Sequence, residues 1–496
     1  MANQNTNVPD KGFFGHPKGL STLFFTEFWE RFSYYGMKAI LAYYIYYSVT
    51  KGGFGLDQST ALQIVSIYGA LIYMTGTIGG WVADRITGTR NALFYGGVLI
   101  MIGHILMAIP GNFTLLMVAL LFIIIGSGLL KPNISTTVGM LYEKNDSRID
   151  SGFTLFYMSI NMGALISPLI IGWLQVNVGF HAGFAAAAIG MFIGLVIYVL
   201  TGNKFLGDLG KGVPDPLSKS DKLNVMKYLT IAAIVIAALV IVAYLTDELK
   251  ISNFSNVITL IGVLLPTIYI IVILKSKKVE KSEKRNVFAY IPLFIASVAF
   301  WMIQEQGSTI LAQFSDKKTE LDMANLTNGL IDFQIPAAWF QSLNPMFILI
   351  FAPIFSLLWV KLGRFNPSTV IKFALGVILA AVAYLLMIIP LTGGQELINP
   401  IWLVLSFMLI TLGELCISPI GLSTTTRLAP KAFTSQMMSV WFLSNAMAQG
   451  LNAQMVKIYS VISTEDYFLY SGLTALGIGV LLILVSPKLK NLMSET

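Results

Sequence analysis

Seven ionisable side chains lie inside stretches of the sequence that are otherwise apolar, namely Glu27, Glu30, Arg31, Lys38, Lys131, Glu305 and Glu414. A charge at the centre of a membrane costs at least about 2.5 kcal/mol, so such residues should face water or one another. Four acids and three bases nearly balance, which suits the binding of a zwitterion together with a mobile proton. The alternative for any single pair is an ion pair that only holds two helices together.

The first apolar stretch carries four of these residues. Glu27, Arg31 and Lys38 fall on one stripe of a helix that turns about 100° per residue. Tyr34 lies on the same stripe, and Glu30 lies at its edge. Because neighbouring residues point in different directions on a helix, Glu30 and Arg31 are expected to do different jobs. One face of this helix is therefore predicted to be polar.

Lys131 and Glu414 each lie close to a proline. Lys131 directly precedes Pro132, and Glu414 lies five residues before Pro419. Proline leaves backbone groups of a helix unpaired, and in a membrane such groups are tolerated where they line a cavity. Both side chains are therefore expected beside a cavity.

Aromatic and amide residues in the apolar stretches could line such a cavity. The aromatic candidates are Tyr34, Tyr35, Tyr73, Trp301 and Trp441, and the amide candidates are Asn161 and Asn344. Most Tyr and Trp residues of membrane proteins pack or form interfacial belts instead. Buried amides can equally hydrogen-bond across helices, so the residues alone leave both roles open.

The composition assigns the chain to a class. Hydrophobic residues make up 55% of the 496 and charged residues 11%, whereas soluble domains are about 25% charged. These values exclude a water-soluble enzyme, a disordered chain and, with Cys416 as the only cysteine, a disulfide scaffold. His16, His104 and His181 lack metal-ligand spacing, and no Ser/His/Asp or phosphate-binding arrangement is visible. Neither an enzyme nor a cofactor is expected.

Fourteen apolar stretches reach the length of about 20 residues that crosses roughly 30 Å of hydrocarbon. They lie near 19–48, 59–83, 90–110, 113–141, 152–175, 183–201, 225–246, 253–275, 288–313, 338–361, 369–391, 399–428, 432–458 and 466–487. The sequence therefore predicts an all-α integral membrane protein with fourteen transmembrane helices. It comprises an N-terminal six-helix bundle at 1–201, a linker with two extra helices at 202–286, and a C-terminal six-helix bundle at 287–496.

The positions of the basic residues predict the orientation of the chain. They collect on the side of the N-terminus, for example Lys144 and Arg148 in one loop and a dense run at 276–286. The opposite side keeps only Lys51, Lys250, Lys317, Lys318 and Lys457. Because cytoplasmic loops carry the excess of Lys and Arg, both termini are expected in the cytoplasm, and the net charge of +7 does not indicate nucleic acid. The 276–286 run could alternatively bind lipid head groups.

Short matches indicate an internal duplication. Residues 126–132 and 413–419 share a Gly-x5-Pro frame, and residues 153–161 match 433–441. If the two extra helices are not counted, these matches pair the fourth span with the tenth and the fifth span with the eleventh. Two homologous six-helix halves around a central cavity would produce this order. The extra pair at 225–275 has no counterpart, so it is expected at the periphery.

Three segments resemble a known family. Residues 27–36, Glu-Phe-Trp-Glu-Arg-Phe-Ser-Tyr-Tyr-Gly, match the signature Glu-x-x-Glu-Arg-Phe-x-Tyr-Tyr-Gly of the proton-dependent oligopeptide transporters of the major facilitator superfamily. Residues 79–90 are similar to the superfamily's loop between the second and third helices, and residues 153–165 to the peptide transporter signature on the fifth. The resemblance extends over essentially the whole chain, including the extra helix pair of the bacterial form.

The resemblance implies the major facilitator fold and a proton-coupled symporter. This transporter would import di- and tripeptides by alternating access, with protons as the coupling ion, as a monomer in the bacterial cytoplasmic membrane. A related carrier for another small anionic or zwitterionic solute, such as nitrate, is the nearest rival. A channel and a membrane enzyme are more distant ones.

The resemblance also implies roles for individual residues. Arg31 and Lys131 would hold the peptide carboxylate, Glu414 the amino terminus, and Asn161 and Asn344 the backbone. Tyr34, Tyr35, Tyr73, Trp301 and Trp441 would shape the side-chain pockets. Glu27, Glu30 and Glu305 would be the proton-coupling and gating residues.

Two positions depart from the family pattern. Close bacterial relatives tend to have arginine where Lys38 stands and two adjacent acids where this chain has Gln304 and Glu305. The outer gate is therefore predicted to rest on a pair between Lys38 and Glu305, without the bidentate geometry of arginine. The second helix also lacks the histidine that eukaryotic members use.

Overall fold

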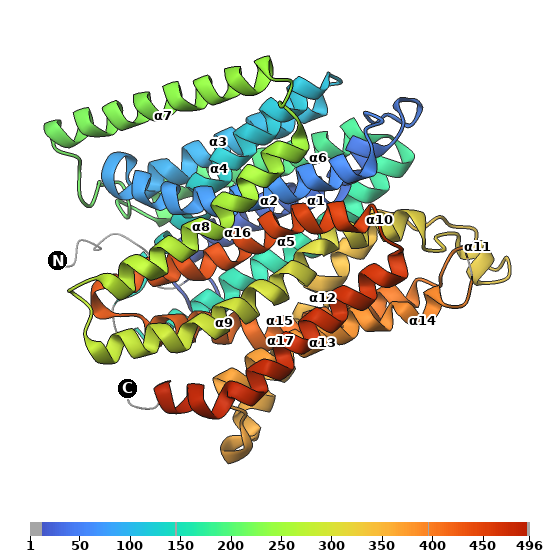
Figure 1. The fold of residues 1–496 in the computed structure, drawn as a ribbon. Coiled ribbons are helices and arrows are strands. Elements are labelled where there is room, and N and C mark those ends of the chain that lie inside the picture. Colours follow the sequence, from blue (N-terminus) through green and yellow to red (C-terminus); the bar gives the residue numbers. More distant parts are fainter. Residues whose placement is uncertain (1–11, 144–145, 395, 494–496) are drawn as a thin grey trace. The chain divides into compact units, whose positions relative to one another are not determined.

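The computed structural model describes residues 12–143, 146–394 and 396–493, and these residues are predominantly helical (Figure 1). Lys144, predicted to lie in a cytoplasmic loop, falls outside them. The long helices are α1 (Gly19–Tyr46), α2 (Gln58–Val82), α3 (Thr89–Ala108), α4 (Phe113–Met140), α5 (Ile149–Asn177), α6 (Phe180–Phe205), α7 (Lys219–Leu245), α8 (Ile251–Lys275), α9 (Lys281–Glu305), α12 (Leu343–Lys361), α13 (Thr369–Leu386), α15 (Ile401–Leu428), α16 (Thr434–Tyr459) and α17 (Thr464–Met493). Shorter helices are α10 (Ile310–Lys317), α11 (Met323–Leu326) and α14 (Ile388–Leu391).

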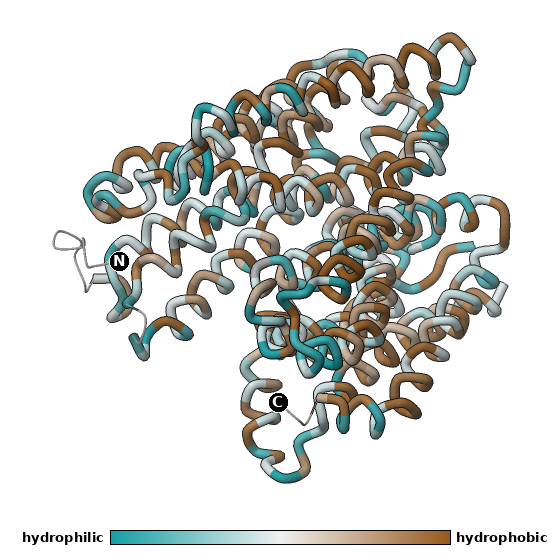
Figure 2. The backbone as a smooth tube through the Cα atoms, turned by 60° about the vertical axis from the view of Figure 1, so that its left-hand side comes forward, coloured by the Kyte–Doolittle hydropathy of each residue, from teal (hydrophilic) through white to brown (hydrophobic). Residues whose placement is uncertain are grey.

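Each predicted apolar stretch is helical, as expected where a membrane leaves every backbone polar group to find its partner inside the segment. Several helices begin at polar caps: the side chain of Asn112 accepts a hydrogen bond from the backbone N–H of Leu115 at the start of α4. Figure 2 shows long hydrophobic runs along the helices. The chain is an all-α, multi-pass membrane protein.

Within the described residues, twelve helical segments are long and apolar enough to cross a membrane. Of the predicted spans, α1 and α16 are not among the twelve. The four ionisable residues of α1 and the many Ser, Asn and Gln residues of α16 explain why. The structure therefore supports twelve of the fourteen spans directly.

The chain divides into two compact units that cut across several helices. Unit 1 comprises Met1–Tyr34, Met74–Gly163 and Phe184–Val257, and unit 2 comprises Tyr35–Tyr73, Ala164–Gly183 and Ile258–Thr496. The bundles expected at 1–201 and 287–496 follow the duplication in the sequence rather than this division, and they stay a prediction.

Close helix contacts within each unit follow the predicted duplication. In unit 1, a Cβ atom on Gly126 of α4 would lie 2.6 Å from the carbonyl oxygen of Gly96 on α3. In unit 2, a Cβ atom on Gly413 of α15 would lie 2.6 Å from the carbonyl oxygen of Gly376 on α13. Gly126 and Gly413 are the glycines of the repeated Gly-x5-Pro frame, so the two copies make the same backbone-to-backbone contact.

The extra helices differ in how they pack. None of the residues of α7 is buried, as expected for a peripheral helix covered by lipid. In unit 2, α8 is attached to α16: the hydroxyl of Thr259 donates a hydrogen bond of 2.7 Å to the carbonyl oxygen of Gly450, and the amide of Gln454 donates one of 2.8 Å to Thr259 Oγ1.

Candidate functional site

The polar stripe of α1 forms a compact ion cluster in unit 1. Arg31 Nε lies 2.8 Å from Glu27 Oε1 and 2.6 Å from Glu30 Oε2. All three residues are buried. Although Glu30 and Arg31 leave the helix in different directions, the long arginine side chain reaches back to both acids. That Glu30 and Arg31 do different jobs stays a prediction.

A second cation joins this cluster through an aromatic ring. Lys131 Nζ lies 4.3 Å from the centre of the Tyr34 ring, and Arg31 Cζ lies 5.6 Å from the same ring. Both distances fit cation–π contacts. Tyr34 is buried and Lys131 is half-buried. Two cations therefore converge at one place, an arrangement that can hold an anion.

Helix α5 allows α1 to approach closely behind this cluster. A Cβ atom on Gly163 would lie 2.5 Å from the carbonyl oxygen of Phe28 and 2.9 Å from Arg31 Cβ. On the same helix, Asn161 donates a hydrogen bond of 3.0 Å to the carbonyl oxygen of Tyr157. The Asn161 amide is therefore engaged within its own helix, and its predicted contact with a peptide backbone is untested.

In unit 2, Glu414 contacts Asn344, although the family resemblance assigns these two residues to different parts of the peptide. Asn344 Nδ2 donates a hydrogen bond of 2.8 Å to Glu414 Oε2 and one of 3.1 Å to the hydroxyl of Thr411. Glu414 is buried in α15, and Pro419 lies inside the same helix. Asn344 thus fixes the carboxylate of Glu414, a role that the sequence did not indicate.

The predicted aromatic residues of unit 2 differ in burial. Trp441 is buried and packs edge-on against Phe373, with ring centres 6.2 Å apart. A Cβ atom on Gly421 would overlap the Trp441 ring, so this glycine makes room for it. Tyr35, Tyr73 and Trp301 are half-buried.

The predicted pair between Lys38 and Glu305 is confirmed as a contact within unit 2. Lys38 Nζ lies 2.9 Å from Glu305 Oε2, and both side chains are only 9% exposed. Two amides from α16, Asn445 and Gln449, also donate hydrogen bonds to the Glu305 carboxylate. Sequence reasoning missed both amides, although their spacing of four residues places them on one helix face.

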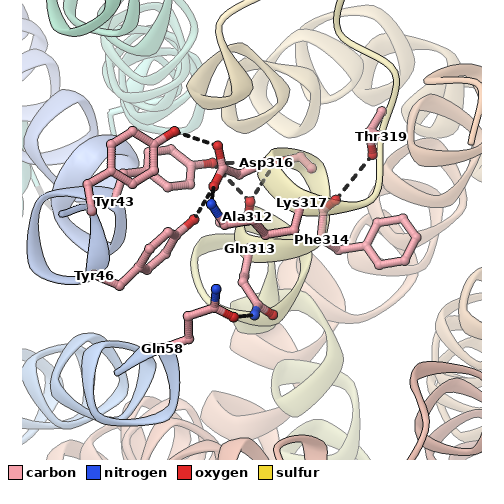
Figure 3. A network of polar contacts seen from close by, with 11 residues as sticks. Tyr43, Tyr46, Gln58, Ala312, Gln313, Phe314, Asp316, Lys317 and Thr319 are labelled. Carbon is pink, nitrogen blue, oxygen red and sulfur yellow. Dashed lines mark hydrogen bonds and ion pairs between the residues drawn. The ribbon is translucent and has the colours of Figure 1, made fainter. Parts of the chain in front are cut away.

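A further polar cluster connects the end of α1 with α10 (Figure 3). The hydroxyls of Tyr46 and Tyr47 donate to the carboxylate of Asp316 over 2.8 and 2.5 Å, and Lys317 Nζ lies 2.9 Å from Asp316 Oδ2. The hydroxyl of Tyr43 donates to the carbonyl oxygen of Ala312 over 3.1 Å. This cluster, which we call the tyrosine–Asp316 cluster, was not predicted from the sequence.

Comparison with known proteins gives the same family as the motif at residues 27–36 of α1. A sequence model of the POT family matches residues 90–472. The chain is 51% identical over 488 residues to an uncharacterised transporter, YclF, of Bacillus subtilis, covering 98% of this chain and 97% of that protein. It is 44% identical over 497 residues to a di-/tripeptide transporter of Lactococcus lactis subsp. cremoris, covering 99% of each. A crystal structure of a mutant peptide transporter POT in complex with alafosfalin has a TM-score of 0.93 and 51% identity, covering 98% of each chain. This protein belongs to the POT family of peptide transporters.

Proposed function

We propose that this protein is a proton-coupled symporter that imports di- and tripeptides by alternating access. The observation that carries the proposal is the ion cluster of unit 1. There, Glu27 and Glu30 contact Arg31 while Lys131 shares the ring of Tyr34 with it. Relatives similar over nearly the whole chain are peptide transporters, which supports the substrate class.

The substrate explains why opposite charges lie inside apolar helices. A peptide loses water from its charged termini at mid-membrane, and fixed opposite charges offset that cost. We assign Arg31 and Lys131 to the peptide carboxylate and Glu414 to the amino group. Asn161 and Asn344 are assigned to the backbone, and Tyr34, Tyr35, Tyr73, Trp301 and Trp441 to the side-chain pockets. Such a site selects for length and tolerates many side chains.

The ion cluster of unit 1 offers a physical route for proton coupling. With both glutamates ionised, Glu27 and Glu30 balance the charges of Arg31 and Lys131. Protonating either glutamate leaves an excess positive charge, which attracts the peptide carboxylate more strongly. Proton and peptide therefore bind cooperatively, as symport requires.

The pair of Lys38 and Glu305 supplies a gate that responds to protonation. The 2.9 Å ion pair joins α1 to the end of α9, and protonating Glu305 removes the attraction. Loss of that attraction shifts the population toward the state in which the two helices separate. Gating and coupling are thus assigned to Glu27, Glu30, Lys38 and Glu305.

The transporter architecture proposed here has fourteen transmembrane helices. It adds α1 and α16 to the twelve apolar segments, because both have 26 residues or more and a helix of about 20 residues crosses a bilayer. Two six-helix halves would flank the α7–α8 pair, in agreement with the repeated glycine contacts. The basic loops favour cytoplasmic termini in a bacterial plasma membrane, and we propose a monomer as the working unit.

Uptake of a labelled dipeptide into proteoliposomes tests this function. Accumulation above the external concentration is expected with an inward proton gradient, and only equilibration is expected without it. Unlabelled di- and tripeptides should compete, whereas nitrate should not. Competition by nitrate without competition by peptides would identify the rival carrier class.

A further inference from the structure

Glu305 accepts hydrogen bonds from two chemically different kinds of partner. Lys38 on α1 contacts Oε2 at 2.9 Å. On α16, Asn445 Nδ2 donates to Oε1 over 3.1 Å, and Gln449 Nε2 donates to Oε2 over 2.5 Å. Both oxygens of the carboxylate therefore have a partner on α16, and all four residues are buried.

The position of Gln449 is built into the packing of a third helix. A Cβ atom on Gly69 of α2 would lie 2.6 Å from Gln449 Nε2 and 2.7 Å from its Cδ atom. A side chain at position 69 would therefore force the Gln449 amide to shift. The carboxylate of Glu414 on α15 also interacts electrostatically with Glu305. The ion pair of Glu305 among the described residues is the one with Lys38.

Lysine and the two amides differ in what they can bind. An ammonium group only donates hydrogen bonds, so Lys38 binds the carboxylate and gains nothing from the protonated acid. A primary amide both donates and accepts. The Oδ1 atom of Asn445 is buried and accepts no hydrogen bond from any described residue. After a rotation of the amide, Oδ1 can accept the O–H of a protonated Glu305.

We propose that Asn445 and Gln449 are positioning residues that hold the carboxyl group of Glu305 in both protonation states, so that protonation releases Lys38 alone. The proton would then loosen the contact between α1 and α9 and leave the contact between α9 and α16 in place. This inference rests on the proposed function in one respect, namely that Glu305 takes up a proton during transport.

Thermal unfolding in detergent tests the positioning independently of transport. Asn445→Leu keeps the branching of the side chain at Cγ and removes the amide. It should lower the melting temperature by about 2 °C both in the parent and in the Glu305→Gln background, whose neutral side chain imitates the protonated acid. Lys38→Met should lower it in the parent only. Loss of the Asn445→Leu effect in the Glu305→Gln background would overturn the proposal, because the amide would then bind only the carboxylate.

The pH profile of gradient-driven uptake gives a second test. Hydrogen bonds to a charged acceptor are about twice as strong as those to a neutral one, so Asn445→Leu and Gln449→Met weaken the hold on the ionised form of Glu305 more than the hold on its protonated form. Protonation becomes easier, and the half-maximal pH should rise by about one unit. The matched control is Asn452→Leu, one turn further along α16, since Asn452 contacts Gln306 and the carbonyl oxygen of Met302 instead. An unchanged profile in both variants would overturn the positioning role.

Different results would overturn the role of Glu305 in transport and the role of the two amides. Full gradient-driven accumulation by Glu305→Gln would remove Glu305 from the proposed coupling, whatever the amides do. Loss of accumulation in Glu305→Gln, together with unchanged pH profiles for Asn445→Leu and Gln449→Met, would overturn only the inference about the amides. A cooperative thermal unfolding transition of each variant in detergent shows that it has folded.

Discussion

Arg31 is a neutralised cation rather than a free one, because two carboxylates lie within 2.8 Å of its Nε atom. Lys131, which lies over the face of Tyr34 and acts electrostatically on Glu27, belongs to the same cluster of balanced charges. At the scale of single residues, removing one negative charge strengthens anion binding, whereas removing the guanidinium disrupts the whole cluster.

Our first prediction concerns Glu27 and Glu30. Glu27→Gln and Glu30→Gln should each abolish peptide accumulation driven by a proton gradient and spare exchange of peptide for peptide, since exchange requires no net proton movement. Arg31→Ala should damage both activities. Proteoliposome uptake and counterflow measure the two activities, and normal accumulation by both glutamine variants would move the coupling role to Glu305.

The second prediction concerns Glu414. Glu414→Gln should weaken the binding of dipeptides by about 1.5–3 kcal/mol, the contribution of a hydrogen bond to a charged group. Analogues with a blocked amino group should lose nothing, because they never made this contact. Competition binding with a dipeptide and its N-acetyl derivative compares the two, and an equal loss for both ligands would contradict the assignment of Glu414 to the amino group.

Contacts between individual side chains could be predicted from the sequence where helix periodicity or the family resemblance indicated both partners. Sequence reasoning predicted that Glu27 and Arg31 share a stripe and that Lys38 pairs with Glu305, and the structure confirms both contacts. It missed the bond between Asn344 and Glu414 and the amides on Glu305. Those contacts depend on how distant helices rotate against each other, which an apolar stretch does not encode.

At the scale of elements, two of the long helices supply most of the polar contacts around Glu305. The helices α1 and α16 are not among the twelve segments that are long and apolar enough to cross a membrane. They supply Lys38, Asn445 and Gln449 around Glu305. Polar residues within a span are costly, so their concentration on these two helices indicates that function, rather than membrane insertion, determines their composition.

The repeated glycine contacts yield a prediction about stability. Gly413→Ala should destabilise the protein by about 1–3 kcal/mol, because its Cβ atom would lie 2.6 Å from the backbone oxygen of Gly376. Gly477→Ala on α17 is the matched control, since its Cβ atom would meet nothing within 4 Å and alanine favours a helix. Thermal unfolding in detergent compares them, and equal melting temperatures would mean that α13 and α15 can move apart at no cost.

The contact of Lys38 with Glu305 yields a prediction about gating. Glu305→Gln should expose a cysteine introduced by Ala312→Cys to membrane-impermeant thiol reagents at a pH where the parent protects it. Ala312 is a suitable reporter position because it is buried. Its contact with Tyr43 uses the backbone oxygen, which the substitution by cysteine leaves in place. Tyr46 is unsuitable, since its hydroxyl binds Asp316. Swapping the two charges in the double variant Lys38→Glu, Glu305→Lys should partly restore protection of the cysteine. Unchanged labelling of the Glu305→Gln variant would show that this pair is not the gate.

At the scale of the whole molecule, the positions and lengths of the helices were predictable, because apolar stretches of membrane length define them. The two six-helix halves stay a prediction. The division of the described residues into units that cut across α1, α2, α5, α6 and α8 was not predictable. Such a division depends on the contacts between helices, whereas a sequence read along the chain shows only the helices themselves.

The last prediction concerns the energy that drives the whole transport cycle. A dipeptide with neutral side chains carries no net charge at neutral pH, so each proton that enters with it moves one positive charge across the membrane. An inside-negative potential should therefore drive its accumulation even when the pH is equal on both sides, with about 2.3 kcal/mol per charge for every 100 mV. Uptake into proteoliposomes with a valinomycin-imposed potassium gradient measures this effect, and a dipeptide with one acidic side chain should respond less because its negative charge offsets one proton. Uptake of the neutral dipeptide that ignores the potential would mean that the proton's charge is compensated by another ion, and the cycle could not be simple symport.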